Sequence, residues 1–171
     1  MAYGNQYGGN SYGGRSGGYN RDNRGSGWQN RPQGQGTGSP RPVQAEILPE
    51  TVPADFVDKA ELVMQEIQSQ RIRITTSKIR NLLSLVSDIY NVEKLRTDAE
   101  LLPESVAKVG MMRVRTAYEA GRDANTKDFV EKAKLLSYLK GIGTNREDLI
   151  RFARYMEALV AYHRFYGGKE A

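Results

Sequence analysis

The sequence has no cysteine and only one histidine, His163, among its 171 residues. The missing thiols exclude disulfides, zinc–cysteine sites, iron–sulfur clusters and thiol catalysis, and a single imidazole excludes any site that needs two histidines. No apolar run approaches the roughly 18 residues of a membrane helix, and no apolar core typical of a signal peptide lies near the N-terminus. With a mean hydropathy of −0.62, these features predict a soluble, cytoplasmic protein without a membrane partner.

The familiar nucleotide and metal motifs are also missing. No Gly-x-x-x-x-Gly-Lys-Ser/Thr phosphate loop occurs, and Gly141-x-Gly143 lacks the third glycine of a dinucleotide loop. The absence of His-Glu-x-x-His and Glu-x-x-His pairs excludes zinc-protease and di-iron chemistry. Composition leaves a Ser–His–Asp triad open, although no serine lies in a nucleophile-elbow context. We therefore predict no metal and no cofactor, and the sequence singles out no catalytic residue, which leaves an enzyme that depends on His163 as the least favoured alternative.

Composition changes sharply near residue 42. Residues 1–42 hold 12 of the 18 glycines, four tyrosines, five arginines and one acidic residue, Asp22, but no valine, leucine or isoleucine. Such a segment buries too little apolar surface to offset the entropy of ordering its backbone, so we predict a disordered low-complexity tail. Its composition is typical of segments that bind single strands loosely. A flexible solubilising extension is an equal alternative.

A linker and one helical domain are predicted after the tail. Residues 43–53 form the linker, because Pro49 and Pro53 oppose helix formation, and residues 54–171 form the domain. Apolar residues recur there at three- and four-residue steps. The pattern predicts helices over 54–69, from Thr75 or Thr76 through Tyr90, from Pro103 to Gly121, over 126–140, and from a capping box at 144–147 to Tyr166. Residues 91–102 allow a short extra turn, and only residues 71–74 resemble a strand. The expected fold is an all-α, compact bundle of five or six helices.

Basic residues on the domain are the candidate nucleic-acid contacts. The net charge is +5, and most of the excess lies in the tail, so a basic surface on the domain must come from segregation of charge. Four cations surround the start of the second predicted helix, where free N–H groups favour phosphate. The candidate RNA-binding residues are Arg71, Arg73, Lys78, Arg80, Arg113, Arg115, Arg122, Arg151 and Arg154. We expect contacts to phosphate rather than to bases, with solvated surface charge as the alternative for each residue alone.

Some of these arginines have an internal alternative. Arg113 lies seven residues after Val106 and is therefore predicted on the apolar side of its helix, where an arginine needs a partner. One-turn spacing predicts ion pairs, for instance Arg154 with Glu157 or Asp148 with Arg151.

The last predicted helix carries two stripes. One stripe leads from Leu149 through Leu159 to His163 and predicts a core-facing, hydrogen-bonded structural histidine. The second stripe lies on the opposite side of the helix. A helix with two apolar sides is either central in a bundle or half of an interface. The mixture of arginine and tyrosine on that side favours an interface. The candidate subunit-interface residues are Tyr155, Ala158, Tyr162 and Phe165.

Four sequence blocks carry a family resemblance. They are residues 74–85 (ITTSKIRNLLSL), 118–122 (YEAGR), 129–135 (FVEKAKL) and 151–169 (RFARYMEALVAYHRFYGGK). Together they resemble the small subunit of type III-A CRISPR effector complexes, the Csm complexes. The likeness runs from about Asp55 to Glu170 and leaves residues 1–50 outside.

The resemblance implies a small all-helical subunit of an antiviral ribonucleoprotein, without catalytic activity of its own. Copies of such a subunit stack into a filament beside crRNA-bound backbone subunits and the large polymerase-like subunit. They support the duplex of target RNA with crRNA through sequence-independent backbone contacts. Within the matching blocks lie Arg80, Arg122, Arg151 and Arg154, while Arg113 stands at a commonly basic position and His163 has no family role. The alternative is a stand-alone single-strand RNA-binding protein that acts through its tail and dimerises through its helical domain.

Overall fold

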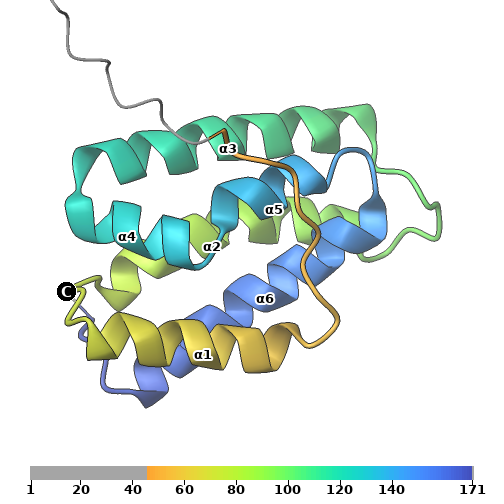
Figure 1. Cartoon of the computed structure of the whole chain (residues 1–171). Helices are drawn as coiled ribbons and strands as arrows, with labels where there is room; N and C mark the ends of the chain where they lie inside the picture. Colours follow the sequence, from red (N-terminus) through yellow and green to blue (C-terminus); the bar gives the residue numbers. More distant parts are fainter. Residues whose placement is uncertain (1–45, 171) are drawn as a thin grey trace, which may run out of the picture. The chain divides into compact units, whose positions relative to one another are not determined.

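Six α-helices form the domain in the computed structural model, which describes residues 46–170 (Figure 1). They are α1 (Phe56–Ser69), α2 (Thr76–Glu93), α3 (Pro103–Arg122), α4 (Ala124–Lys132), α5 (Leu135–Gly141) and α6 (Arg146–Phe165). In this part of the chain, β pairing is limited to an isolated bridge between Glu100 and Asn145. The predicted all-α bundle is confirmed. The predicted tail, residues 1–42, lies outside the described residues.

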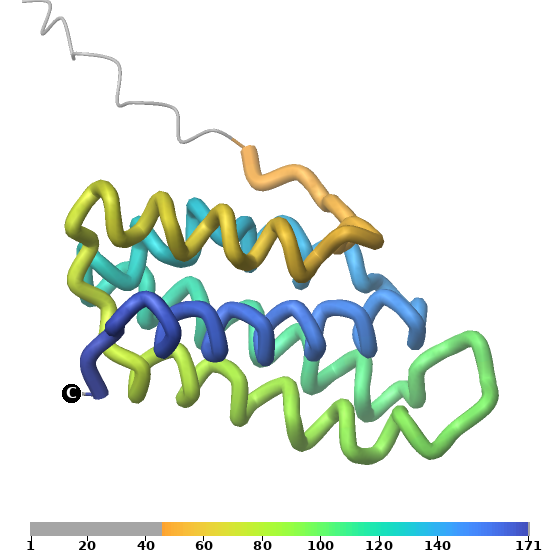
Figure 2. Tube along the Cα trace, turned by 90° about the horizontal axis from the view of Figure 1, so that it is seen from below, coloured from red at the N-terminus to blue at the C-terminus, as the bar shows by residue number. Residues whose placement is uncertain are grey.

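Helix α6 lies at the centre of the bundle. It packs against α1, α2 and α5, and Figure 2 shows it between α1 and α2. Its side chains Leu149, Phe152, Tyr155, Met156 and Leu159 are completely buried. Two apolar stripes are therefore needed because the helix has neighbours on two sides. Within residues 46–170, none of the helices combines the length and apolar content needed to cross a membrane.

The observed helix caps agree only in part with those predicted from the sequence. Thr75 caps α2, as one of the two predicted residues, and its hydroxyl accepts a hydrogen bond from the Lys78 N–H at 3.3 Å. The capping box predicted at 144–147 is wrong. Asn145 caps α6 instead, accepting from the N–H groups of Glu147 at 2.9 Å and of Asp148 at 3.2 Å. The turn at Gly143, with φ +53°, places Asn145 rather than Thr144 before the first helical residue.

The helix predicted over 126–140 is interrupted. Lys134 has a left-handed φ of +52° and separates α4 from α5. The Lys134 ammonium group lies 2.8 Å from the Glu50 carboxylate. The break changes the direction of the chain, so Phe129 of α4 and Leu135 of α5 are both buried. Residues 71–74, which resemble a strand in sequence, form irregular structure between α1 and α2.

A buried carboxylate organises the connection between α2 and α3. Glu93 is completely buried, and its two oxygens accept hydrogen bonds from the Leu102 N–H at 3.1 Å and from Arg96 at 2.9 Å. Burial raises the pKa of Glu93, but hydrogen bonds from Ser105, Leu102 and Arg96 hold that pKa below its ordinary value. Arg146 donates to the Glu93 carbonyl at 3.0 Å and ties α6 to the same corner. Residues 91–93 continue α2, and the Arg96 N–H donates to the Glu93 carbonyl at 3.1 Å in one further turn, so the network fixes the irregular connection that follows.

Replacing Glu93 tests the importance of this network. We expect Glu93→Gln to lower the free energy of unfolding by about 2–3 kcal/mol, because the amide leaves buried donors and the Arg96 charge without a carboxylate. Chemical denaturation followed by circular dichroism measures the change. Glu157→Gln, on the exposed side of α6, is the matched control and should change the free energy by less than about 0.5 kcal/mol. Equal effects of the two substitutions would contradict this account.

Candidate nucleic-acid interface

Five of the nine candidate cations lie at one end of the bundle. This end contains the α1–α2 connection, the α3–α4 turn and the last described residues, as both views show (Figures 1 and 2). The Arg73 N–H donates to Asn125 at 2.9 Å, and Lys78 pairs with Asp123 at 2.9 Å, so hydrogen bonds and ion pairs also join these segments. We call this surface the cationic end. It comprises Arg71, Arg73, Lys78, Arg80, Arg122 and Lys169.

The first turn of α2 does not offer free N–H groups at this end. The Thr76 N–H donates to the Lys169 carbonyl at 2.8 Å, and the Ser77 N–H donates to the Glu170 carbonyl at 3.2 Å. The C-terminal segment therefore occupies the positions that a phosphate would need. Gly168 permits this path, because the His163 ring leaves no room for a Cβ there. The expectation of phosphate at this helix start is wrong, although the surrounding cations remain.

Three cations of this end form ion pairs with considerable exposure. Lys78 pairs with Asp123, Arg80 pairs with Glu170, and Arg122 lies 3.7 Å from Glu119. Hydrogen bonds from Thr126 and Lys78 lower the pKa of Asp123 to about 2, so this carboxylate is charged at neutral pH. Exposed pairs of this kind contribute little to stability. Their cations can therefore exchange a carboxylate for a phosphate at small cost.

Arg71 and Arg73 differ from these three. Both side chains are exposed, and neither forms an ion pair with any residue in the described range. Arg71, two residues after the end of α1, has a left-handed φ of +55°, and its N–H donates to the Gln68 carbonyl at 3.0 Å. Glycine is the residue that suits this backbone position. A long cationic side chain is present there at a conformational cost.

The arginines in the middle of α3 face solvent. Arg113 is exposed, and its predicted place on the apolar side is wrong. The buried stripe of α3 runs through Val109, Met112 and Thr116, and each helical residue turns about 100° from the last. Arg113 therefore projects beside this narrow stripe. Arg115 is also exposed and lines a groove between α2 and α3.

The two α6 arginines lie apart from the cationic end along the central helix. Arg151 is half-buried, pairs with Glu147 at 2.8 Å and with Asp148 at 3.7 Å, and donates to the Val52 carbonyl at 3.4 Å. The predicted pair with Asp148 is thus confirmed. Arg154 is exposed, and within the described structure the predicted pair with Glu157 does not form. The nine candidates therefore do not make one continuous surface.

The candidate interface on α6 is largely part of the core. Tyr155 is completely buried, packs edge-on against Tyr138 with ring centroids 5.5 Å apart, and donates to the Ala133 carbonyl at 3.2 Å. Burial raises the pKa of Tyr155 well above its ordinary value. Its assignment to a subunit interface is wrong, because the central position of α6 covers this side with other helices. Ala158 and Tyr162 are half-buried, and Phe165 is 77% exposed.

Exposed apolar side chains gather instead along α3. Met111, Val114 and Tyr118 are each more than half exposed and line a groove of about 590 Å³ with Leu85 and Ile89 of α2. Asp88 and Glu119 balance Lys108 and Arg115 at its rim. This surface is apolar and electrically balanced, unlike the cationic end. Apolar spacing does not reveal this groove, because Met111, Val114 and Tyr118 lie beside the buried stripe of α3 rather than on it.

All six helices lie within the region that is similar to known proteins. Residues 50–169 match the family model described as Csm2 Type III-A. A CRISPR system Cms protein Csm2 from Streptococcus thermophilus is 46% identical over 119 residues, which cover 68% of this chain and 94% of that protein. The protein of the same name from Mycobacterium tuberculosis (strain CDC 1551 / Oshkosh) is 38% identical over 117 residues, again 68% and 94% of the two chains.

The chain belongs to the Csm2 family. It is a small subunit of the type III-A Csm complex. The Csm2 match includes all nine candidate cations and ends at Lys169, whereas residues 1–49 lie outside it. The resemblance seen in the four sequence blocks is thereby confirmed.

His163 of this Csm2-family domain has the structural environment that its spacing predicts. The ring is 6% exposed, its Nε2 donates to the Ile74 carbonyl at 3.1 Å, and its Nδ1 lies 3.1 Å from the Thr76 hydroxyl. Burial lowers the pKa of His163, and the Ile74 carbonyl only partly offsets this effect. Arg164 lowers the pKa further and Glu170 raises it. Both ring nitrogens are occupied by contacts that join α6 to the start of α2.

The lowered pKa of His163 predicts a pH-dependent stability. The unfolded chain binds a proton near the ordinary value of about 6.5, whereas the folded protein binds it only at lower pH. The unfolded state therefore holds more protons in this window, and the free energy of unfolding falls as pH falls through about 6.5. We expect His163→Gln to show a smaller loss between about pH 7.5 and 5.5. Denaturation curves at the two pH values measure it, and identical losses in both proteins would contradict the assignment.

Proposed function

We propose that this chain acts in the cytoplasm as a non-catalytic support of the crRNA–target RNA duplex in a type III-A CRISPR interference complex. Its cationic end neutralises RNA phosphates without reading base sequence. Copies of the chain stack into a filament beside the crRNA-bound backbone subunits and the large polymerase-like subunit. A complex that accepts any guide sequence needs contacts to the backbone rather than to base edges.

The exposed arginines at the cationic end carry this proposal. Arg71 and Arg73 project from the α1–α2 connection without a carboxylate partner in the described structure, beside the exchangeable pairs of Lys78, Arg80 and Arg122. Every one of these residues lies within the region that matches the family. Flexible, exposed cations are suited to phosphate and not to a specific base.

A supporting role without catalysis agrees with the state of His163. The two ring nitrogens already have partners, and the ring is almost completely buried. A general base must reach the proton that it removes from a substrate. The imidazole is committed to holding α6 against the start of α2, so it serves structure.

Stacking between copies needs apolar surface that the bundle leaves uncovered. With Tyr155 in the core, the α2–α3 groove and Phe165 are two of the exposed apolar surfaces of the described residues, which also include Leu62 and Leu95. They come from different helices, so a contact between them would be heterologous and could propagate along a filament.

Charge reversal tests the assignment of the cationic end. We expect Arg73→Glu with Arg122→Glu to weaken target RNA binding by the reconstituted complex about tenfold or more at moderate salt, and to reduce the dependence of binding on salt. Filter binding or fluorescence anisotropy over a salt series measures both quantities.

The matched control changes the net charge equally at exposed positions away from this end. Lys94→Glu with Lys140→Glu should leave binding within about threefold of the unmodified complex. If the control weakens binding as much as the test variant, a general charge effect replaces the proposed surface. If neither variant weakens it, the chain does not contact RNA phosphates through these residues.

Deleting residues 1–42 separates this proposal from a tail-driven RNA-binding protein. We expect complex assembly and target binding to survive the deletion, because the matched region begins at residue 50. Native mass spectrometry of the complex and a target-binding titration check the two outcomes. Loss of RNA binding with an intact helical domain would favour the stand-alone alternative.

A further inference from the structure

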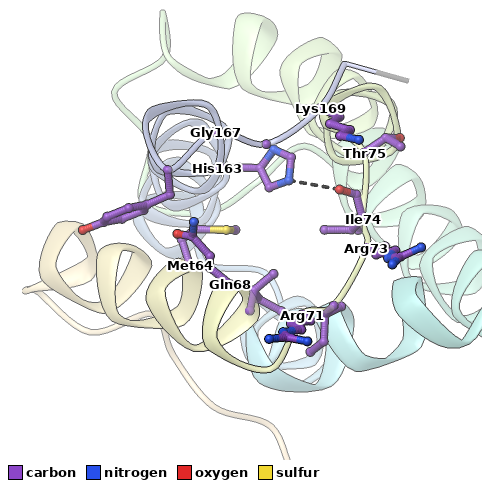
Figure 3. Close-up of a pocket in the computed structure, with 13 residues that line it drawn as sticks. Met64, Gln68, Arg71, Arg73, Ile74, Thr75, His163, Gly167 and Lys169 are labelled. Atoms are coloured by element: carbon purple, nitrogen blue, oxygen red, sulfur yellow. Dashed lines mark hydrogen bonds between the residues drawn. The ribbon is translucent and has the colours of Figure 1, made fainter.

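A pocket lies inside the cationic end. It has a volume of about 490 Å³ and is formed by α1, the α1–α2 connection, the end of α6 and the residues that follow α6. Figure 3 shows Met64 and Ile74 pointing toward one another across this space, with His163 at its edge. The volume falls within the range of about 300–1,000 Å³ typical of small-ligand pockets.

The floor and the rim of the pocket differ in character. Met64, Ile67 and Ile74 close the bottom of the pocket and are almost completely buried, while the half-buried Ile72 and Tyr166 present apolar surface to it. The lining includes Arg71, Arg73 and Lys169 but no aspartate or glutamate. The α2–α3 groove, in contrast, carries two acids and two bases. An apolar floor with an uncompensated cationic rim suits a ligand that has a flat apolar body and a negative charge.

Arg71 is placed at this rim in spite of its backbone. Its φ of +55° favours glycine, and its side chain forms no ion pair in the structure of residues 46–170. Folding alone would be served as well by glycine, because the Gln68 carbonyl accepts from the backbone N–H and needs no side chain. The arginine side chain therefore points to a role toward a ligand.

We propose that this pocket receives one unpaired nucleotide, with its base on the apolar floor and its phosphate at Arg71 and Arg73. The inference rests on the proposed function and adds to it, because backbone support of a duplex does not require a base pocket. Thioether, aromatic and guanidinium groups stack on any base, so occupation would not depend on sequence. The Gln68 side chain on the wall supplies an amide to the base edge.

Methyl NMR of the full chain tests the proposal directly. The probes are uridine monophosphate, uridine, and a single-stranded oligouridine of about eight nucleotides. We expect the monophosphate and the oligomer to shift the methyl signals of Met64 and Ile74 in a saturable way, while Met111 in the α2–α3 groove stays unchanged. Uridine, which lacks the phosphate, should bind about tenfold more weakly than its monophosphate.

Two substitutions remove the pocket's function by different routes. Arg71→Gly removes the cation while giving the backbone its preferred residue, so the melting temperature should stay the same or rise. Gln68→Trp fills the space from an exposed position on α1 without a change in charge. We expect each to weaken oligouridine binding about fivefold or more, whereas Lys94→Gln, a charge control at the far end of α2, should not.

The outcomes separate the possible occupants. If the free monophosphate displaces oligouridine from Met64 at equal nucleotide concentration, the ligand is a free nucleotide; if it does not, the ligand is a nucleotide within a strand. The proposal is overturned if neither probe shifts Met64 and Ile74, or if both pocket variants bind as the unmodified chain does. It is also overturned if a purified backbone subunit shifts these methyls and RNA does not, because a protein segment then fills the pocket.

Failure of the pocket can be told apart from failure of the proposed function. If Arg73→Glu with Arg122→Glu weakens target binding by the complex but RNA leaves the Met64 signal unchanged, the phosphate surface stands and the pocket does not. If the charge reversal has no effect and the Met64 signal is unchanged, both are wrong.

Discussion

The burial of α6 between α1 and α2 is the constraint on which the rest of the domain depends. A helix with neighbours on two sides needs apolar residues around most of its circumference, and α6 supplies them from Leu149 to Leu159. Tyr155 shows how the remaining polar atoms are managed, because its hydroxyl donates to the Ala133 carbonyl where α4 ends. The break between α4 and α5 then lets both short helices turn their apolar residues inward. The other helices pack around α6, and the connections between them form the exposed surfaces, including the cationic end.

Ion pairs between segments that are far apart in the sequence position the charged side chains at the cationic end. Lys78 and Arg80 of α2 face carboxylates from the α3–α4 turn and from the C-terminal segment, respectively. These pairs orient the cations without burying them, and exposed pairs cost little to break. Arg71 and Arg73 lie beside them without such partners in the described structure. A surface of this kind is suited to the proposed binding of a polyanion through many weak, exchangeable contacts, and it also frames the apolar pocket between α1 and α6.

The periodicity of the sequence was enough for the helices and for most of the core, since apolar spacing records which side of a helix is covered. It also predicted the structural role of His163, because a polar residue in an apolar stripe needs hydrogen-bonding partners. Spacing does not record how wide the covered side is, so it predicts Arg113 on the apolar side and Tyr155 at an interface, and both predictions are wrong. Nor does it record contacts between distant segments. The left-handed residues Lys134 and Arg71, the buried Glu93, and the carbonyls of Lys169 and Glu170 at the start of α2 each depend on partners that no local pattern specifies. The pocket was missed for the same reason, as its walls come from both ends of the domain.

The return of residues 169 and 170 to the first turn of α2 has a consequence for the order in which the domain can form. During synthesis, α2 emerges from the ribosome long before its carbonyl partners have been made. The N–H groups of Thr76 and Ser77 therefore stay bound to water while α3, α4, α5 and α6 are produced. His163, which holds the same junction through Ile74 and Thr76, also arrives late. Closure of the bundle, with completion of the cationic end, is thus a late event in biosynthesis. A nascent chain stalled before residue 169 lacks part of the pocket wall, namely the part formed by the residues after α6.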